Sequence, residues 1–337
     1  MYANPVVTGN LLYVGSCSGS VFALNLETGK KEWEYYAGDR SFHGDPLYND
    51  SVLFIPSDWP PFKNDASPIY ALHLLTGKLI WKTDMIGLSE LGYGVTTGLI
   101  KTSHGIQGVT TQDELVCLSA SDGDIRWKFR TKYDTTLSYW NSDPVASGDT
   151  VYFAGQDGIV YALNSLDGVV LWKRDIGSPV STSTVFSSGA IYFGTSDGSI
   201  HRIWLGGEKQ VSKKVNGTPG FKMSCTNDAI FFLSAKNEGD YVMKTVHAYD
   251  LSLDNQLWEL QARNNANWSI KKAYPYRDYV IVGDSKGGVY FLESRSGKIV
   301  YSFQLEGQIR SLDYDNEMLY IGTINGIVYA VSCKGLN

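Results

Sequence analysis

The chain has 337 residues, of which 13% are aromatic, 19% are charged and 35 are glycine, a composition typical of short strands joined by tight turns. The formal charge of −6 is spread along the chain, which excludes a basic face for nucleic acid, and no apolar run reaches the length of a membrane span. The first residues show neither the basic nor the apolar region of a signal peptide. Because the four cysteines lie far apart without a CxxC pair, we expect free thiols and no metal site.

A repeat runs through the whole chain. The small or turn residue that closes the second strand of each unit recurs every 39 to 54 residues, a period typical of propeller blades. The eight positions are Gly15, Pro56, Thr110, Gly155, Gly194, Ser234, Gly283 and Gly322. We therefore predict a single domain over residues 1–337, with repeats near 5–35, 46–83, 95–130, 143–176, 179–215, 220–260, 270–304 and 309–335.

Each unit predicts four antiparallel strands in the same order. In the first unit, a strand near NPVVTG is followed by LLYVG, a turn, SVFALNL, a turn at Thr28-Gly29 and a fourth strand. Central turns such as Asp157-Gly158 and Asn325-Gly326 suit the positive φ of two-residue hairpins. The fourth strand carries an aromatic residue at a fixed offset in six units: Trp33, Trp81, Trp127, Trp172, Trp258 and Tyr301.

Several units depart from this pattern, and long turns on a regular scaffold often carry function. The second has DWPPFKNDASP at 58–68, the third opens with residues 88–98, and the sixth has an insertion at 236–245. The fifth has GGEKQV at 206–211 where the aromatic strand is expected. The eighth ends after its third strand, and only four residues precede the first strand. Either the last blade has three strands, or the chain is a segment of a longer protein.

These motifs resemble the quinoprotein-type (PQQ-like) repeat, in which a strand of the form VYVGSxDGxVYALD leads into TGxxxW. The resemblance covers Pro5 to Cys333. It implies an all-β fold, an eight-bladed β-propeller of four-stranded antiparallel blades, with the last blade an exception if it has three strands. It also implies that the fourth-strand aromatics dock against the next blade. We expect each to bury a large apolar area, so that truncation to Ala costs about 3–5 kcal/mol.

In such a propeller the first strand of each blade lines a central channel, and the loop that enters it lies at one face. Ring closure would gather aromatic rings, cations, carboxylates and an imidazole from these loops. The predicted ligand-binding residues are Phe42, His43, Asp45, Tyr93, Trp140, Asn141, Asp143, Phe221, Lys222, Trp268, Lys271 and Arg310. Two cations about 8 Å apart repel by roughly 2 kcal/mol, so this gathering indicates either an anion or compensation by the carboxylates. Alternatively, the charges face solvent and the rings fill the channel.

No catalytic motif is present. The resemblance to PQQ-dependent dehydrogenases does not extend to their adjacent cysteines or to a calcium-binding cluster of acids and Asn, so no cofactor, including PQQ, is expected. GxSxG, HExxH, Walker and GxGxxG motifs are missing from the sequence. His43 and Asp45 are the candidates for an acid–base pair, although such pairs are more often structural.

Three functions therefore remain open. The first is a non-catalytic scaffold that binds a protein partner or small ligand, as the resemblance to BamB-type outer-membrane-assembly propellers implies. The second is an enzyme that uses the pocket for acid–base chemistry on a small anionic or aromatic substrate. The third is a sensor or adhesin domain of a longer protein. We expect a monomer that binds no nucleic acid; the resemblance implies a periplasmic or secreted location if the N-terminus is truncated, and otherwise a cytoplasmic one.

Overall fold

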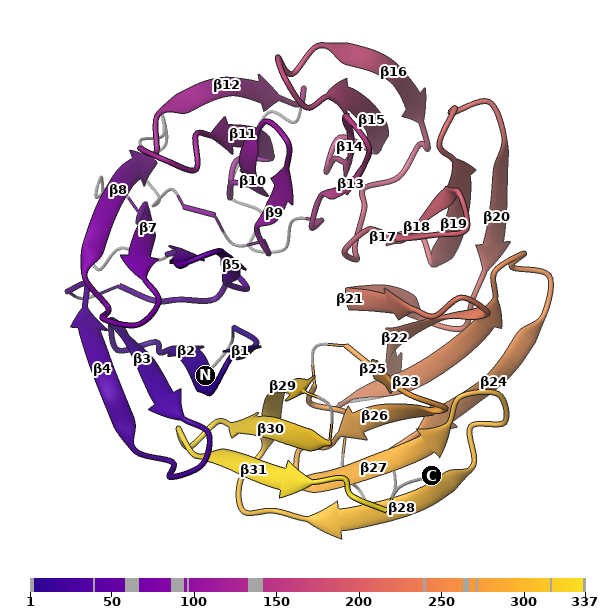
Figure 1. The fold of residues 1–337 in the computed structure, drawn as a ribbon. Coiled ribbons are helices and arrows are strands. Elements are labelled where there is room, and N and C mark those ends of the chain that lie inside the picture. The colour runs from indigo at the N-terminus through magenta and orange to yellow at the C-terminus, as the bar shows by residue number, and fades with distance from the viewer. Residues whose placement is uncertain are drawn as a thin grey trace. The chain divides into compact units, whose positions relative to one another are not determined.

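Thirty-one β-strands form eight antiparallel sheets in the described part of the chain, which contains no helix (Figure 1). The computed structural model describes residues 3–38, 40–57, 67–85, 94–95, 97–132, 142–238, 241–262, 267–270, 272–315 and 317–335. The sheets are the blades of an eight-bladed β-propeller, in which seven blades have four strands and the eighth has three. This confirms the predicted fold, including the three-stranded last blade. The described residues fall into two compact units, so the prediction of a single domain stays a prediction.

Unit 1 comprises Met1–Tyr139, Ser165–Gly168 and Ser311–Asn337, and it holds blades 1, 2, 3 and nearly all of blade 8. Its strands are β1 (Val6–Thr8), β2 (Leu11–Gly15), β3 (Ser20–Asn25), β4 (Lys31–Tyr36), β5 (Leu47–Asn49), β6 (Val52–Pro56), β7 (Ser67–His73), β8 (Leu79–Met85), β9 (Ile100–Thr102), β10 (Gly105–Val109), β11 (Glu114–Leu118), β12 (Ile125–Arg130), β29 (Ile309–Asp315), β30 (Met318–Thr323) and β31 (Val328–Ser332).

Unit 2 comprises Trp140–Asn164 and Val169–Arg310, and it holds blades 4 to 7. Its strands are β13 (Val145–Ser147), β14 (Thr150–Ala154), β15 (Ile159–Asn164), β16 (Val170–Asp175), β17 (Val185–Ser187), β18 (Ala190–Thr195), β19 (Ser199–Trp204), β20 (Gln210–Lys214), β21 (Thr218–Cys225), β22 (Ala229–Glu238), β23 (Tyr241–Asp250), β24 (Gln256–Gln261), β25 (Tyr274–Tyr276), β26 (Tyr279–Gly283), β27 (Gly288–Glu293) and β28 (Ile299–Gln304).

The central hairpin turns are held by the acidic residue of the repeat motif. In blade 7 the Asp284 carboxylate accepts hydrogen bonds from the backbone N–H groups of Lys286 and Gly288 and from the Tyr290 hydroxyl. In blade 4 the Asp157 carboxylate accepts from the Ile159 N–H and the Tyr161 hydroxyl. An Asp that bonds to backbone two residues ahead favours a turn, and these aspartates therefore have a structural role.

Five fourth-strand tryptophans dock against the next blade, as predicted. Each indole lies over the glycine of the next turn, where an added Cβ would come within 2.5 to 2.7 Å of the ring. Each indole N–H donates to a main-chain carbonyl of that blade: Trp33 to Leu74 (2.7 Å), Trp81 to Ala120 (3.1 Å), Trp127 to Ser165 (3.1 Å), Trp172 to Leu205 (2.9 Å) and Trp258 to Ser294 (2.8 Å). Ring and N–H together fix one blade on the next.

For Tyr301 the docking prediction is wrong. Its side chain is 43% exposed, and its ring packs edge-on against Tyr279 and Phe291 of its own blade. The tryptophans dock on the turn that joins the third and fourth strands of the next blade. The described residues give blade 8 three strands, and a turn between a third and a fourth strand is not among them.

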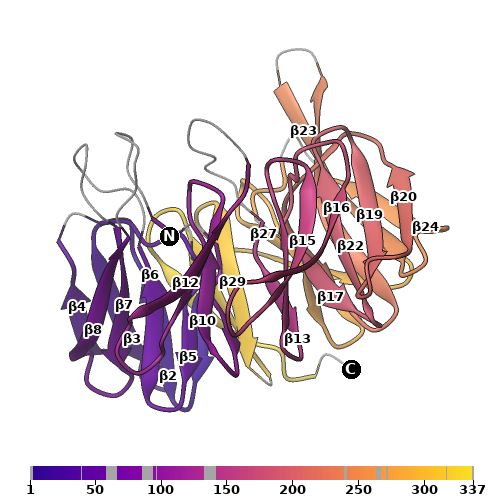
Figure 2. The ribbon, with the colours of Figure 1, turned by 90° about the horizontal axis from the view of Figure 1, so that it is seen from above.

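The departures from the repeat have distinct structural outcomes. The insertion at 236–245 lengthens β22 and β23 to ten residues each, and this hairpin extends beyond the neighbouring strands of unit 2 (Figure 2). In the fifth unit, Gly207 is the turn glycine under Trp172, and β20 follows with Val211 packed on the core instead of an aromatic residue. Residues 58–66 and 86–93, from the long segments of the second and third units, lie outside the described residues.

Candidate functional site

In unit 1 the structure places Phe42 in the core. Its ring is fully buried, lies 6.0 Å from the ring of Tyr70, and packs between blades 1 and 2. A Cβ on Gly15 would lie 2.7 Å from the Cβ of Phe42, so the repeat glycine at this position makes room for the ring. Phe42 therefore stabilises the packing of two blades, and its placement leaves no exposed ring for the predicted ligand contact.

His43 and Asp45 have structural neighbours of their own. The Nε2 atom of His43 lies 3.6 Å from the thiol of Cys17, which is exposed. The Asp45 carboxylate accepts hydrogen bonds from the backbone N–H of Asn4 (2.9 Å) and from its side-chain amide (2.8 Å). These two bonds attach the segment before β1 to the start of blade 2.

In unit 2 the structure brings two of the predicted charged residues together. The Lys222 ammonium lies 3.0 Å from the Asp143 carboxylate, with the two side chains 16% and 19% exposed. Lys222 belongs to β21, and Asp143 comes two residues before β13. One predicted cation is thus compensated by one predicted carboxylate, which is one of the two alternatives that the sequence left open.

Trp268 is placed in the core of unit 2. It is 2% exposed, its indole N–H donates to the Leu260 carbonyl (3.0 Å), and its ring meets the ring of Tyr290 edge-on at 5.6 Å. Like Phe42, it stabilises packing in the described structure.

Lys244, a residue that the sequence analysis did not single out, lies beside the predicted residues Phe221 and Arg310. Its ammonium is 4.5 Å from the centre of the Phe221 ring. Burial lowers the pKa of Lys244, and the Arg310 guanidinium lowers it further. Among the described residues, no carboxylate forms an ion pair with Lys244. We call Lys222, Lys244 and Arg310 the basic cluster; all three belong to unit 2.

The side chain of Asn267 positions Lys244 on the long hairpin. It accepts a hydrogen bond from the Lys244 N–H (3.1 Å) and donates one to the Val242 carbonyl (2.5 Å), which satisfies the edge of β23. The insertion at 236–245 was the sequence signal for this element. What the sequence could not show is that the hairpin brings its lysine to Phe221 and Arg310.

Four predicted ligand-binding residues, Tyr93, Trp140, Asn141 and Lys271, lie outside the described residues. Nothing in the structure tests their predicted role.

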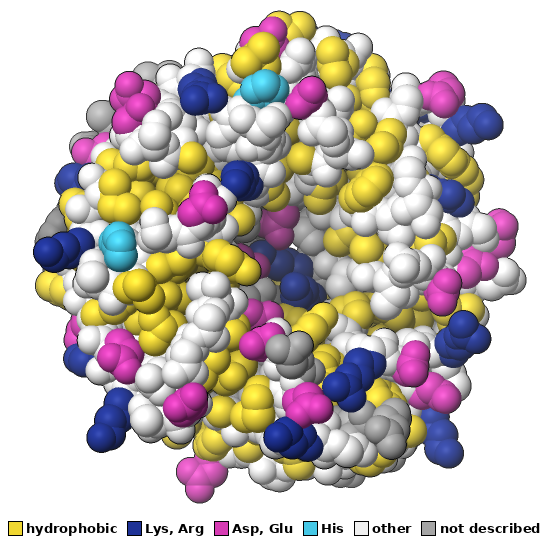
Figure 3. All heavy atoms as spheres, viewed as in Figure 1, with side chains coloured by type: hydrophobic (Ala, Val, Ile, Leu, Met, Phe, Trp, Pro, Cys, Tyr) yellow, Lys and Arg dark blue, Asp and Glu magenta, His cyan; other side chains and the backbone are white. Residues whose placement is uncertain are grey.

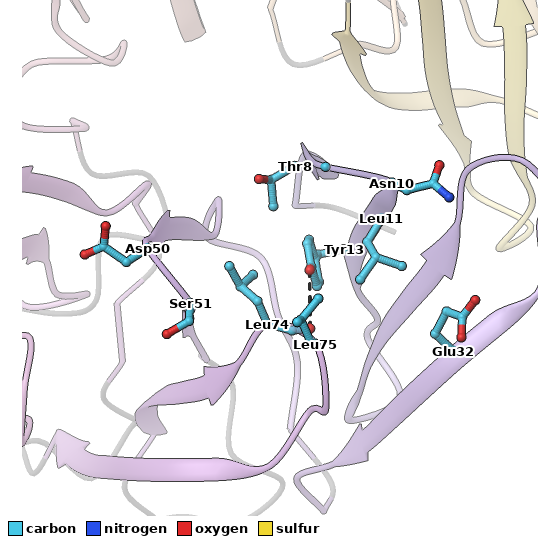
Figure 4. A pocket seen from close by; sticks show the side chains of 10 residues that line it. Thr8, Asn10, Leu11, Tyr13, Glu32, Asp50, Ser51, Leu74 and Leu75 are labelled. Atoms are coloured by element: carbon cyan, nitrogen blue, oxygen red, sulfur yellow. Dashed lines mark hydrogen bonds between the residues drawn. The ribbon is translucent and has the colours of Figure 1, made fainter.

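A separate recess of about 500 Å³ lies in unit 1, between the first turn of blade 1 and blade 2 (Figure 4). Leu11, Tyr13, Leu74 and Leu75 provide apolar surface, and Glu32 and Asp50 lie on either side of them in the view of Figure 4. The Tyr13 hydroxyl donates to the Leu74 carbonyl (3.3 Å), and burial raises the pKa of Tyr13 to about 12. The phenol therefore acts as a neutral structural donor.

Two titratable side chains, His201 and His247, lie within the sheets. His201 and His247 are buried against Phe193 and Phe232, and burial lowers the pKa of each to about 4. Both are therefore neutral near pH 7. Within the described ranges, no group of three His, Cys, Asp or Glu side chains has the arrangement of a metal site.

The surface view agrees with the even spread of charge in the sequence. Acidic and basic side chains alternate over the face seen in Figure 3, without a single-sign field. The described residues include no helix with the length and hydropathy needed to cross a membrane.

Comparison with known proteins places this architecture in a family. The model of the family described as "Outer membrane protein assembly factor BamB" matches residues 65–224 and 242–335. BamB from Moranella endobia is 21% identical over 350 residues, which covers 98% of this chain and 85% of that protein. Tetrathionate hydrolase from Acidithiobacillus ferrooxidans is 23% identical over 216 residues, which covers 53% of this chain and 41% of that enzyme.

The fold comparison agrees. The crystal structure of BamB from Moraxella catarrhalis superimposes with a TM-score of 0.79 at 18% identity, covering 98% of this chain and 96% of that one. At this identity the similarity shows the fold alone. The resemblance that the repeat motifs predicted is confirmed by the family match.

Proposed function

The chain belongs to the BamB family of outer membrane protein assembly factors, and from this premise we propose that it is a non-catalytic scaffold that binds a protein partner. The observation that carries the proposal is the length of the match. The alignment with BamB from Moranella endobia covers 98% of this chain and 85% of the relative, whereas the alignment with the tetrathionate hydrolase covers 41% of the enzyme. Following the names of these relatives, the partner acts in outer-membrane protein assembly.

The basic cluster is the surface that we assign to this partner. A half-buried ammonium that lies near a guanidinium and has no carboxylate partner among the described residues is stabilised when an acidic group approaches. Lys244 lies on β23 opposite Ala235, at the base of the part of the long β22–β23 hairpin that extends beyond its neighbours in unit 2 (Figure 2). The partner is therefore expected to present Asp or Glu side chains to this hairpin.

A capture experiment tests the proposal. The purified, tagged chain is incubated with detergent-solubilised bacterial outer membranes, and the bound proteins are identified by mass spectrometry. We expect proteins of the outer-membrane assembly machinery to be retained. Lys244→Glu should reduce their amount by about tenfold or more, because the glutamate would repel the acidic side chains of the partner; tenfold corresponds to about 1.4 kcal/mol of binding free energy.

Lys213→Glu is the matched control, since Lys213 is an exposed lysine on β20 of the same unit. It should leave capture unchanged. If no assembly protein is retained by the wild-type chain, the scaffold proposal is wrong. If both charge reversals have equal effects, the proposal fails for the basic cluster and only non-specific attraction remains.

A second candidate function is the binding of a small anionic substrate by the same cluster. It is favoured by the position of Lys244 over the Phe221 ring, because aromatic surface beside a few charged groups is typical of small-ligand sites. For this second candidate function we propose neither PQQ nor any other cofactor. Titration of the chain with pyrophosphate would show saturable binding that Lys244→Met abolishes, and the absence of saturation would exclude it.

A further inference from the structure

The recess between blades 1 and 2, which we call the unit 1 recess, has the size and lining of a binding site. Its volume of about 500 Å³ lies within the range of small-ligand sites, and Leu11, Tyr13, Leu74 and Leu75 provide its apolar surface. Leu75 is 71% exposed. An exposed leucine at the border of a recess is apolar surface that a bound partner can remove from water.

Two carboxylates flank this apolar surface: Glu32 of β4 and Asp50 of the turn between β5 and β6 (Figure 4). The Glu32 carboxylate accepts a hydrogen bond from the Asn25 side-chain amide (3.0 Å), a neutral donor that leaves the negative charge uncompensated. In the described part of the chain, the Asp50 carboxylate takes part in neither a hydrogen bond nor an ion pair. The unit 1 recess therefore combines two negative charges with apolar surface.

The lysines next to these positions are bonded elsewhere. The Lys31 ammonium lies 2.5 Å from the Glu34 carboxylate, and the Lys101 ammonium donates to the Asn49 side chain. The described lining of the unit 1 recess contains no lysine or arginine. A cation that enters the recess from outside would therefore meet two carboxylates and no competing positive charge from this lining.

The acid on β4 is specific to blade 1. Glu32 directly precedes the fourth-strand tryptophan, and the residue at this place differs from unit to unit. In the six units with a fourth-strand aromatic residue it is Glu32, Ile80, Arg126, Leu171, Leu257 and Val300. Only the first of these is acidic. The negative charge of the unit 1 recess is therefore a local feature and does not follow from the repeat.

Blade 3 shows how a guanidinium fits the same place in the repeat. Arg126 is the counterpart of Glu32, because each lies at the irregular point of register just before the tryptophan. The Arg126 guanidinium donates to the carbonyl of His104. His104 is the second residue of the turn before β10, as Asn10 of the recess lining is before β2. Blade 3 thus supplies its own guanidinium, whereas blade 1 has a carboxylate in its place.

We propose that the unit 1 recess binds an arginine side chain of a protein partner. The guanidinium pairs with the carboxylates of Glu32 and Asp50, and the aliphatic stem, with an apolar neighbour in the partner, covers Leu74 and Leu75. Arginine suits this lining because its guanidinium is weakly hydrated and pairs with carboxylates while its stem packs on apolar surface. The proposal rests on the scaffold function, because the partner supplies the arginine, and it concerns a surface other than the basic cluster.

The test uses a fluorophore-labelled heptapeptide, GSLRLSG, in which one arginine lies between two leucines. It is titrated with the whole chain and followed by fluorescence anisotropy. We expect saturable binding, and an affinity lower by about tenfold or more when citrulline, which has the same shape without the charge, replaces the arginine.

Two nearly isosteric substitutions in the protein test the carboxylates. Glu32→Gln and Asp50→Asn should each weaken binding of the arginine peptide by about threefold, as expected for an exposed ion pair. Both positions are exposed, and asparagine tolerates the φ of +52° at Asp50, so neither change should disturb the fold. Asp124→Asn is the matched control, since Asp124 is an exposed acid of blade 3 in the same unit, and it should have no effect.

The inference is overturned if the arginine peptide does not bind or if the citrulline peptide binds equally well. It is also overturned if Asp124→Asn weakens binding as much as Asp50→Asn, because the attraction would then be that of any acidic surface.

Capture from solubilised outer membranes separates this inference from the scaffold function. The double variant Glu32→Gln/Asp50→Asn should retain less of the assembly proteins than the wild type, and equal retention would contradict the assignment of the recess to the partner. Capture by the wild type without binding of the arginine peptide would leave the scaffold function intact and remove the recess proposal alone. Charge-dependent peptide binding without capture of any assembly protein would support arginine recognition and remove the scaffold function.

Discussion

The indole N–H of Trp33 donates to the carbonyl of Leu74, 2.7 Å away and 41 residues later in the chain. Five contacts of this kind join successive blades, and each combines one hydrogen bond with burial of a large ring on a turn glycine. Because the same device is repeated, single substitutions within it can be compared with matched positions in other blades.

Truncation of a docked tryptophan should be far more damaging than truncation of Tyr301. Trp33→Ala removes a ring that is 9% exposed and should lower the free energy of unfolding by about 3–5 kcal/mol. Tyr301→Ala, at a ring that is 43% exposed, should cost less than about 2 kcal/mol. Urea unfolding followed by circular dichroism measures both. Equal losses would contradict the docking role.

The turn glycines should differ in their tolerance of a methyl group. Gly77→Ala and Gly29→Ala both place alanine at positive φ, which costs about 1–2 kcal/mol. Only at Gly77 does the added Cβ meet a ring, 2.5 Å from an atom of Trp33. The resulting overpacking should lower the free energy of unfolding by about a further 1–3 kcal/mol. Thermal unfolding of the two variants measures the difference. Equal stability would contradict a clash between the added methyl group at Gly77 and the Trp33 ring.

Stability should fall between pH 6.5 and pH 4 because of two buried histidines. Burial lowers the pKa of His201 and of His247 from 6.5 to about 4. In this window the unfolded chain binds more protons than the folded one. The contribution of the two neutral histidines to the free energy of unfolding is therefore complete above pH 6.5 and decreases as the pH falls toward 4. The difference corresponds to roughly 3 kcal/mol for each histidine.

The measurement is urea unfolding at pH 7 and pH 4.5, compared between the wild type and His247→Gln. The glutamine does not titrate and can still bond to the Ser234 hydroxyl, which lies 2.7 Å from His247 Nε2. The variant should lose less stability on acidification than the wild type. An identical pH dependence would show that His247 is not buried as a neutral ring.

Asn267 should control the opening of the long hairpin. Asn267→Ala removes the hydrogen bonds to Lys244 N–H and the Val242 carbonyl, so amide exchange at Lys244 should become about tenfold faster or more. Asn216→Ala, at an exposed turn, is the control and should leave this amide unchanged. Hydrogen exchange measured by mass spectrometry provides the comparison. Unchanged exchange in Asn267→Ala would mean that other contacts hold the edge of β23.

Most of the fold could be predicted from local features of the sequence. Alternation along strands, turn dipeptides and an aromatic residue at a fixed offset are short-range signals, and they located eight blades and five docked tryptophans. Tyr301 is the exception because its docking depends on the structure of the next blade. Its docking position belongs to the next blade, and a property of blade 8 is not encoded in the strand that carries Tyr301.

The candidate site could be predicted only in part, because loop residues from different blades meet through packing. Compensation of the cations by carboxylates was one of two alternatives that the sequence left open, and Lys222 pairs with Asp143. Phe42 and Trp268, by contrast, are core residues although their loops resembled ligand contacts. Lys244 was missed, because only the register of a ten-residue hairpin brings it to Phe221.

The sequence by itself determined the repeat and the number of blades, since strand periodicity and turn chemistry act over a few residues. The tertiary structure decided which side chains are buried, which cations meet and which turn glycines lie under an indole. These depend on distances between residues far apart in the chain, such as Leu26 and Tyr320, which only the packing of one blade against the next brings together.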